Sequence, residues 1–191
     1  MIGKAMKLRI PKVLRSFVRE EHGTVITETV IIFPILIWAY VALFVYWDAY
    51  RTETTAVKAS YTVADIVTRQ VSDIDPAYID NLDRLFQYLV DVDQETTIVV
   101  SSVEYQQNGD KYDVQYSEAR GIGAARMTDS MMASMRSQMP RMSDGDTVIV
   151  VQTGVTYVPP FQVGVPEFTY TQFIVTRPRG PKVTCPTCAL S

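Results

Sequence analysis

The feature that most constrains this chain is an uncharged apolar run of nineteen residues, Thr29–Trp47, near the start of the sequence. As a helix the run would extend roughly 28 Å, at about 1.5 Å per residue, which is close to the hydrocarbon thickness of a bilayer. Aromatic residues gather toward its far end at Tyr40, Tyr46, Trp47 and Tyr50, as they do in the interfacial belts of membrane proteins. The run therefore predicts a transmembrane helix.

The charge distribution predicts the orientation of this helix. The chain of 191 residues has a net charge of −3, but residues 1–22 carry +4 and residues 48–191 carry −6. Because basic residues accumulate on the cytoplasmic side of a membrane segment, residues 1–22 are expected in the cytoplasm. The larger C-terminal part is then expected in the periplasm of a bacterium, or beyond it. Its acidic balance disfavours binding to nucleic acid, which requires a basic face.

A cleaved secretory signal is the alternative to a retained anchor. The apolar core of such a signal is usually about 7–15 residues long and ends in a small-x-small cleavage site. This run is longer, and the residues at its end are Trp47-Asp48-Ala49-Tyr50-Arg51. The sequence therefore favours a retained single-pass anchor.

The helix is expected to continue beyond the membrane. Val57, Tyr61, Ala64 and Val67 recur at helical spacing, and Val71 follows four residues later. One long helix, half in the bilayer and half packed on a soluble domain, is the simplest arrangement that accounts for both segments.

Local patterns after this helix predict both helices and strands. Asp75-Pro76 is typical of an N-cap followed by proline at the first helical position, and Asn108-Gly109 is a strong signal for a hairpin. One predicted helix follows Pro76 and has an apolar stripe of Ile79, Leu82, Leu85, Phe86 and Leu89, and a second covers Ala124–Gln138. Four strands are predicted: Thr96–Tyr105, a strand that contains Tyr112, Val114 and Tyr116, Thr147–Tyr157, and Phe168–Thr176.

Together these patterns predict an α+β fold. A long N-terminal transmembrane helix continues into a periplasmic domain, in which a roughly four-stranded antiparallel sheet of two hairpins is packed by helices on one face. The expected divisions are a basic cytoplasmic leader over 1–23, a transmembrane helix over 24–50, an extracytoplasmic domain over 51–176, and a proline-rich tail over 177–191 without regular structure.

A carboxylate lies at the start of the apolar segment. Glu28 is the fifth residue after Gly23, and Pro34 interrupts the apolar run itself. A charge this close to a membrane span is costly and indicates a function by default, although a glutamate that reaches out from the membrane edge is the simpler alternative. Proline removes a backbone donor, which a membrane helix tolerates when neighbouring helices or water satisfy the freed carbonyl.

The combination of a basic leader, Gly23, Glu28 and Pro34 resembles type IV prepilins, in particular the TadE-like (TadE/TadG) pilin-like family of tight-adherence (Flp) pilus systems. The resemblance covers about residues 19–50. It implies that a prepilin peptidase cuts between Gly23 and Thr24, so that Glu28 becomes the fifth residue of the mature chain.

The same resemblance implies a role in pilus assembly. The protein would be a minor pilin or pseudopilin of the bacterial inner membrane, with other pilin-like subunits, the prepilin peptidase and the pilus assembly platform as partners. A carboxylate among apolar helices is stable when it is paired. The α-amino group of a newly cut neighbouring chain, cationic at neutral pH, would provide that pair for Glu28 and align the helices in register.

Cys185 and Cys188 form a Cys-Pro-Thr-Cys motif near the C-terminus. In a thioredoxin-like domain this spacing marks a redox centre, but there the motif opens a helix after a strand. Here it lies in a proline-rich tail, and a location outside the cytoplasm favours a structural or intersubunit disulfide. A structural zinc site within one chain would need further ligands, and the single histidine, His22, is expected across the membrane.

Other patterns predict structure more readily than chemistry. Met127, Met131, Met135 and Met139 repeat at helical spacing and are expected to form a core face on the sheet. Because His22 is the single histidine, a Ser-His-Asp or Cys-His arrangement cannot form in the exported part. This weighs against many hydrolase mechanisms, though not against carboxylate chemistry. The pilin-like resemblance implies no enzymatic activity, and we expect no catalytic, cofactor-binding or metal-binding residues.

Two other functions remain open. An uncleaved single-span adaptor would use its periplasmic domain to dock an envelope complex or a ligand. A membrane-tethered thiol oxidoreductase would use Cys185 and Cys188. Full-length protein in the membrane would favour the adaptor, whereas function retained without both cysteines would exclude the oxidoreductase.

Overall fold

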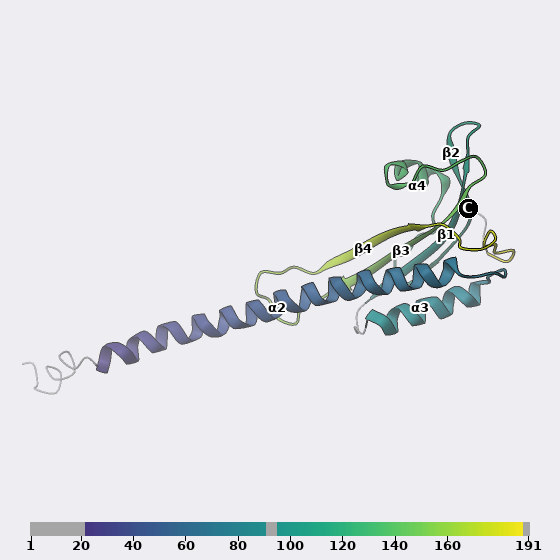
Figure 1. Ribbon diagram of the computed structural model, residues 1–191. Coiled ribbons are helices and arrows are strands. Elements are labelled where there is room, and N and C mark those ends of the chain that lie inside the picture. The colour runs from purple at the N-terminus through teal and green to yellow at the C-terminus, as the bar shows by residue number, and fades with distance from the viewer. Residues whose placement is uncertain (1–21, 91–94, 189–191) are drawn as a thin grey trace, which may run out of the picture.

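The computed structural model describes residues 22–90 and 95–188, and for residues 22–24 it describes the backbone alone. Figure 1 shows a long helix that projects from a domain of mixed helices and strands. Residues 1–21 of the predicted leader (1–23) and residues 189–191 of the predicted tail lie outside the described residues. The elements in chain order are α2 (His22–Thr68), α3 (Pro76–Val90), β1 (Thr96–Gln106), β2 (Lys111–Arg120), α4 (Asp129–Ser134), the 3-10 helix η1 (Arg136–Gln138), β3 (Thr147–Tyr157) and β4 (Phe168–Thr176).

The long N-terminal helix is confirmed, and α2 continues from the apolar run into the domain. In its second half, small and β-branched side chains allow a close approach to the sheet, where the hydroxyls of Ser60 and Thr153 are hydrogen-bonded at 2.7 Å. The helix ends at Thr68, so the expected Val71 lies beyond it and is exposed. Of the expected apolar pattern, Ala64 and Val67 are buried, Val57 is half-buried and Tyr61 is exposed. The buried residues in this half of the helix are Ala49, Thr52, Ala56, Ala59, Ser60, Val63, Ala64, Val67 and Thr68.

The second helix, α3, begins where the sequence predicts. The Oδ1 atom of Asp75 accepts a hydrogen bond from the backbone N–H of Tyr78 at 2.7 Å, so Asp75 caps a helix whose first residue is Pro76. The predicted apolar stripe faces inward, and α3 contacts α2, β1 and β2. Its buried residues are Ile79, Leu82, Phe86 and Val90.

The sheet has four antiparallel strands in the order β2-β1-β3-β4. Both predicted hairpins, β1–β2 and β3–β4, are formed, and β1 pairs with β3 in the middle, where Val100 lies opposite Val151. The turn between β1 and β2 contains the predicted Asn108-Gly109, and Gly109 has a φ of 99° that favours glycine. The α+β architecture with a four-stranded antiparallel sheet is therefore confirmed.

Strand β2 departs from the expected alternation. Val114 and Tyr116 were expected on one face, but a bulge at Gln115 shifts the register, so Val114 pairs with Val103 and Tyr116 with Ser102. Val114 consequently belongs to one core cluster and Tyr116 to the other. One extra residue is sufficient because the side chains of a strand alternate between its two faces.

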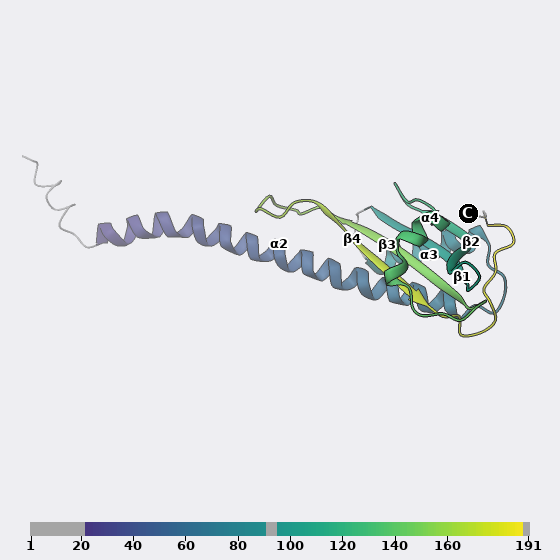
Figure 2. The same cartoon turned by 90° about the horizontal axis from the view of Figure 1, so that it is seen from above.

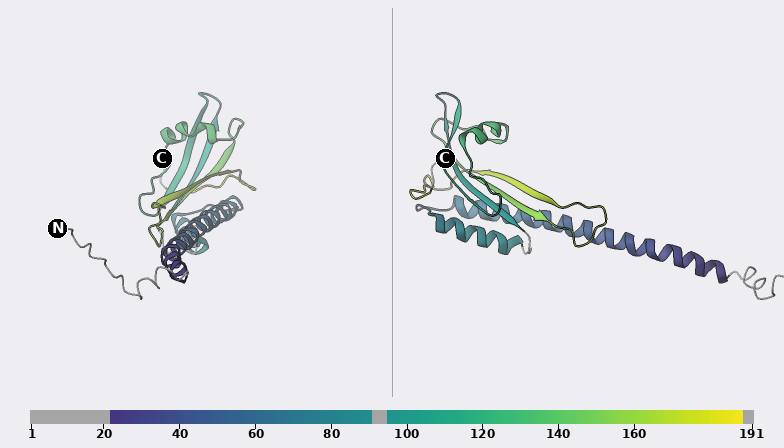
Figure 3. Two further views of the ribbon diagram at one scale, coloured as in Figure 1. Left: turned by 90° about the vertical axis from the view of Figure 1, so that its left-hand side faces the viewer. Right: turned by 180° about the vertical axis from the view of Figure 1, so that it is seen from behind.

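Apolar side chains cover both faces of the sheet, and this corrects the expectation that all helices share one face. Figures 1 and 3 show α2 and α3 on one side of the sheet and α4 on the other. The cause lies in β3, where Ile149 and Val151 face α2 and α3 while Val148 and Val150 face the opposite side. A strand with apolar side chains on both faces needs other elements packed against each of those faces.

The third helix is shorter than predicted. The sequence predicts a helix over Ala124–Gln138, but regular α-helix is confined to α4 and is followed by η1. The backbone N–H of Met127 donates instead to Ser117 Oγ at 2.7 Å, which ties this segment to β2. The methionines still pack against the sheet as their pattern predicts. This second cluster comprises Val103, Val114, Met127, Met132, Val148 and Val150, with Met131, Met135 and Met139 packed against it.

Candidate functional site

The first part of α2 extends beyond the sheet and α3, and residues 25–38 are all exposed. Residues 25–44, here called the free segment, project away from the sheet and α3 (Figure 2), and large side chains such as Ile31, Phe33 and Leu36 are exposed. The length and composition of α2 are sufficient to cross a membrane. Exposed apolar surface on this scale indicates contact with lipid or with other proteins.

The residues singled out by the sequence lie in order along this helix. Gly23 and Thr24 are in the first turn, where the structure describes the backbone alone. Glu28 is exposed, and no hydrogen bond or ion pair to it occurs among the side chains that the structure describes. Pro34 lies within the helix. A cut after Gly23 would therefore leave a chain that is helical from its new N-terminus.

Two tyrosines hold α2 at the point where it leaves the domain. Tyr157, at the end of β3, donates its hydroxyl to the carbonyl oxygen of Val45 at 3.2 Å and to Asp48 Oδ2 at 3.1 Å. Tyr170 on β4 donates to the carbonyl oxygen of Ala49 at 2.9 Å. Val45 and Ala49 are both buried. These contacts define the end of the free segment.

The Tyr157 contact does not depend on pH in the physiological range. Burial, followed by the hydrogen bond to Asp48, raises the pKa of Tyr157 to about 12. The hydroxyl therefore stays protonated and continues to donate. Sequence reasoning identified Tyr157 only as the end of a strand, because no local pattern indicates a partner 112 residues earlier in the chain.

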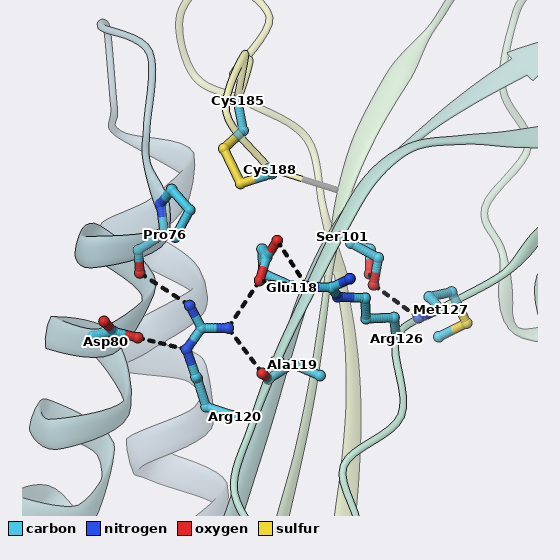
Figure 4. Close-up of polar contacts among 11 residues, drawn as sticks. Pro76, Asp80, Ser101, Glu118, Ala119, Arg120, Arg126, Met127, Cys185 and Cys188 are labelled. Atoms are coloured by element: carbon cyan, nitrogen blue, oxygen red, sulfur yellow. Dashed lines mark hydrogen bonds and ion pairs between the residues drawn. A yellow bond between two sulfur atoms is a disulfide. The ribbon is translucent and has the colours of Figure 1, made fainter. Parts of the chain in front are cut away.

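A second group of polar residues joins the sheet edge to α3 (Figure 4). The side chain of Glu118 is 3% exposed and pairs with Arg120 Nη1 at 2.8 Å and with Arg126 Nη2 at 3.4 Å. Arg120 also donates from Nε to Asp80 Oδ1 at 2.5 Å and from Nη2 to the carbonyl oxygen of Pro76 at 3.2 Å. The buried carboxylate is thus compensated by two guanidinium groups. We assign this group a structural role, which is to hold β2 against α3.

Cys185 and Cys188 are joined by a disulfide. Their exposures of 7% and 8% place them within the core cluster shared by α2, α3 and the sheet. The tail that carries them is pinned to the domain, since the backbone N–H of Ile74 donates to the carbonyl of Thr184 at 2.9 Å. A buried disulfide of this kind is typical of packing rather than of an accessible redox centre. Among the described residues, no group of three His, Cys, Asp or Glu side chains could hold a metal ion.

Comparison with known protein families, with characterised proteins and with solved structures finds no match to this chain. The assignment of function therefore depends on the residues and the geometry described above. Among these features, the free segment with Glu28 contributes little to the packing of the α+β domain, so its role must be sought outside the fold of that domain.

Proposed function

We propose that this protein is a minor pilin or pseudopilin that takes part in the assembly of a tight-adherence (Flp) type IV pilus. The observation that carries the proposal is the exposed apolar free segment, with Glu28 near its start, continuous with a helix that packs on an α+β domain. A helix with this surface can move from a bilayer into a bundle of similar helices, because lipid tails and apolar side chains are similarly apolar surroundings.

In this proposal the free segment crosses the bacterial inner membrane once. The basic leader lies in the cytoplasm and the α+β domain lies in the periplasm, as the positive charge before the span favours. A prepilin peptidase cuts after Gly23, and Thr24 becomes the first residue of the mature chain. The N-terminal helix then associates with other pilin-like subunits at the pilus assembly platform.

Glu28 would set the position of neighbouring helices. Its carboxylate is exposed on the free segment, and a carboxylate transferred into an apolar bundle is stable only when it is paired. The α-amino group that cleavage creates on Thr24 of a neighbouring chain is cationic at neutral pH. Pairing between these two groups would fix the axial register of the helices.

The first test is the intact mass, or the N-terminal sequence, of the protein in its native membrane with the cognate peptidase present and then deleted. We expect a chain that begins at Thr24 when the peptidase is present and a chain that retains Gly23 when it is deleted. Gly23→Val should block the cut because it enlarges the residue at the scissile bond. Gly3→Val, the same change elsewhere in the leader, should be processed normally.

A chain that keeps Lys4 to Gly23 in both strains would contradict the proposal. That outcome would favour the alternative of an uncleaved single-span adaptor, whose domain docks an envelope complex. Processing of Gly3→Val but not of Gly23→Val would, by contrast, locate the cut at Gly23.

A third function, that of a membrane-tethered thiol oxidoreductase, is tested by the double substitution Cys185→Ser and Cys188→Ser. We expect pilus assembly to be retained, with a loss of about 2 kcal/mol in the free energy of unfolding, because the disulfide closes a short loop. Pili and the stability of the purified protein are measured in parallel. Loss of assembly by a variant that remains folded would support thiol chemistry instead.

A further inference from the structure

The connection between β3 and β4, residues 158–167, extends beside the free segment of α2. It starts directly after Tyr157, which is bonded to the carbonyl of Val45, and it returns to the sheet at Phe168. Figures 1 and 3 show this loop reaching past the ends of both strands, along α2 toward the N-terminus of the helix. With the free segment in a membrane, this loop would be the part of the domain next to the bilayer.

The composition of the loop suits a membrane interface. Its ten residues read Val-Pro-Pro-Phe-Gln-Val-Gly-Val-Pro-Glu, and no lysine or arginine occurs anywhere over residues 147–176. Val158 and Phe161 are 51% and 52% exposed, so these apolar side chains are not used by the domain core. Each of the three prolines lacks a backbone N–H, which reduces the number of donors that need a partner where water is scarce.

Aromatic rings of the domain lie at the same level as those of the helix. The ring of Phe168 is 5.7 Å from that of Tyr157 and 4.5 Å from that of Tyr170, measured between centroids. The Tyr170 hydroxyl is bonded to the carbonyl of Ala49, close in sequence to Trp47. Since tyrosine and tryptophan prefer the boundary between membrane and water, the helix and the base of the loop would meet that boundary at one depth.

We infer that residues 158–167 are a second membrane contact, in which Phe161 and its apolar neighbours enter the interfacial region of the leaflet on the side of the domain. The inference rests on the proposed anchoring of α2 in the membrane. A single span leaves a domain free to rotate about the helix axis, whereas a second contact to one side of the helix fixes that rotation. The loop would thereby determine which side of α2 is presented to neighbouring subunits.

Lipid fits this surface better than a second copy of the chain does. Protein interfaces combine an apolar centre with a polar rim and are enriched in arginine. The loop offers a single charged residue, Glu167, next to β4. Its exposed apolar side chains, Val158 and Phe161, belong to a loop that runs along α2, and the free segment of α2 is itself proposed to lie in lipid.

The inference is tested with the full-length protein in which Phe161→Cys carries an environment-sensitive fluorophore. The two native cysteines are bonded to each other, so under non-reducing conditions the introduced thiol is the one that reacts. The matched variants are Ile37→Cys, on the free segment, and Asn108→Cys, in the turn at the opposite end of the sheet. Each protein is placed in vesicles of phosphatidylcholine and phosphatidylglycerol that contain a nitroxide quencher either near the headgroup or near the end of the acyl chain.

We expect the label at position 161 to lose most of its emission to the quencher near the headgroup. The label at position 37 should lose most of its emission to the quencher near the chain end, and the label at position 108 should respond to neither. This pattern would place the loop at the interface and the free segment across the bilayer.

The other outcomes separate the two proposals. Quenching at position 37 without quenching at position 161 would overturn the second contact and leave the membrane anchor intact. Absence of quenching at position 37 would overturn the anchor, and the inference with it. A label at position 161 that is shielded only at a high ratio of protein to lipid, and is not quenched by lipid, would show that a second copy of the chain covers the loop.

Discussion

Replacing Glu28 with leucine is expected to abolish pilus assembly while the protein still folds and enters the membrane. The carboxylate is exposed on the free segment and takes no part in the domain core, so the loss would come from the missing pair with the amino terminus of a neighbouring chain. Glu28→Gln should fail in the same way, because it keeps the size of the side chain and removes the charge. Pili sheared from cells are counted by electron microscopy, and the amount of each variant in the membrane is measured by immunoblot.

Glu53→Gln provides the matched control for this prediction. Glu53 is also exposed on α2 but lies beyond the free segment, in the half of the helix that packs on the domain. Removing its charge should leave assembly normal. Normal assembly by the Glu28 variants would show that the pairing role is wrong. Equal loss in the Glu28 and Glu53 variants would show that α2 is sensitive to charge in general.

Replacing Gly121 with alanine is expected to lower the free energy of unfolding by about 3–5 kcal/mol. Gly121 follows β2 with a φ of 97°, and an added Cβ would lie 2.1 Å from the carbonyl oxygen of Thr96 and 2.8 Å from Cα of Thr97. Both are backbone atoms at the start of β1, so rotation of a side chain cannot relieve the clash. The cost combines a left-handed backbone conformation with displacement of a central strand.

Gly123→Ala separates these two contributions. Gly123 also has a positive φ, 78°, but an added Cβ would meet nothing within 4 Å. We expect a loss of about 1–2 kcal/mol, the cost of the left-handed conformation alone. Urea unfolding of the full-length variants in detergent micelles, followed by circular dichroism, gives both values. Equal losses at the two positions would contradict the clash with β1.

Secondary structure that is set by residues close together in the chain was predictable from the sequence. The strands Thr147–Tyr157 and Phe168–Thr176 have the predicted bounds, and Asp75 caps α3 as its position before Pro76 indicates. The Asn108-Gly109 turn joins β1 and β2 for the same reason, since turn chemistry is decided within a few residues. The position of Glu28 on a continuous helix also follows from the apolar run around it.

Elements that depend on distant contacts were not predictable. The methionine spacing favours one helix over Ala124–Gln138, yet Ser117 on β2 accepts the backbone N–H of Met127 and the helix begins only at Asp129. The bulge at Gln115 reverses the face of Tyr116 for a similar reason, because it is set by pairing with β1. Propensity is a weak prior where tertiary contacts compete with it.

By itself, the sequence determined the long apolar helix, the mixture of helices and strands, and the two hairpins, because periodicity, capping and turn residues act over a few neighbouring positions. Only the tertiary structure decided the strand order β2-β1-β3-β4, the use of both faces of the sheet, and the attachment of α2 at Val45 by Tyr157. These features join residues far apart in the chain. They depend on which apolar surfaces must be buried together, and no short stretch of sequence contains that information.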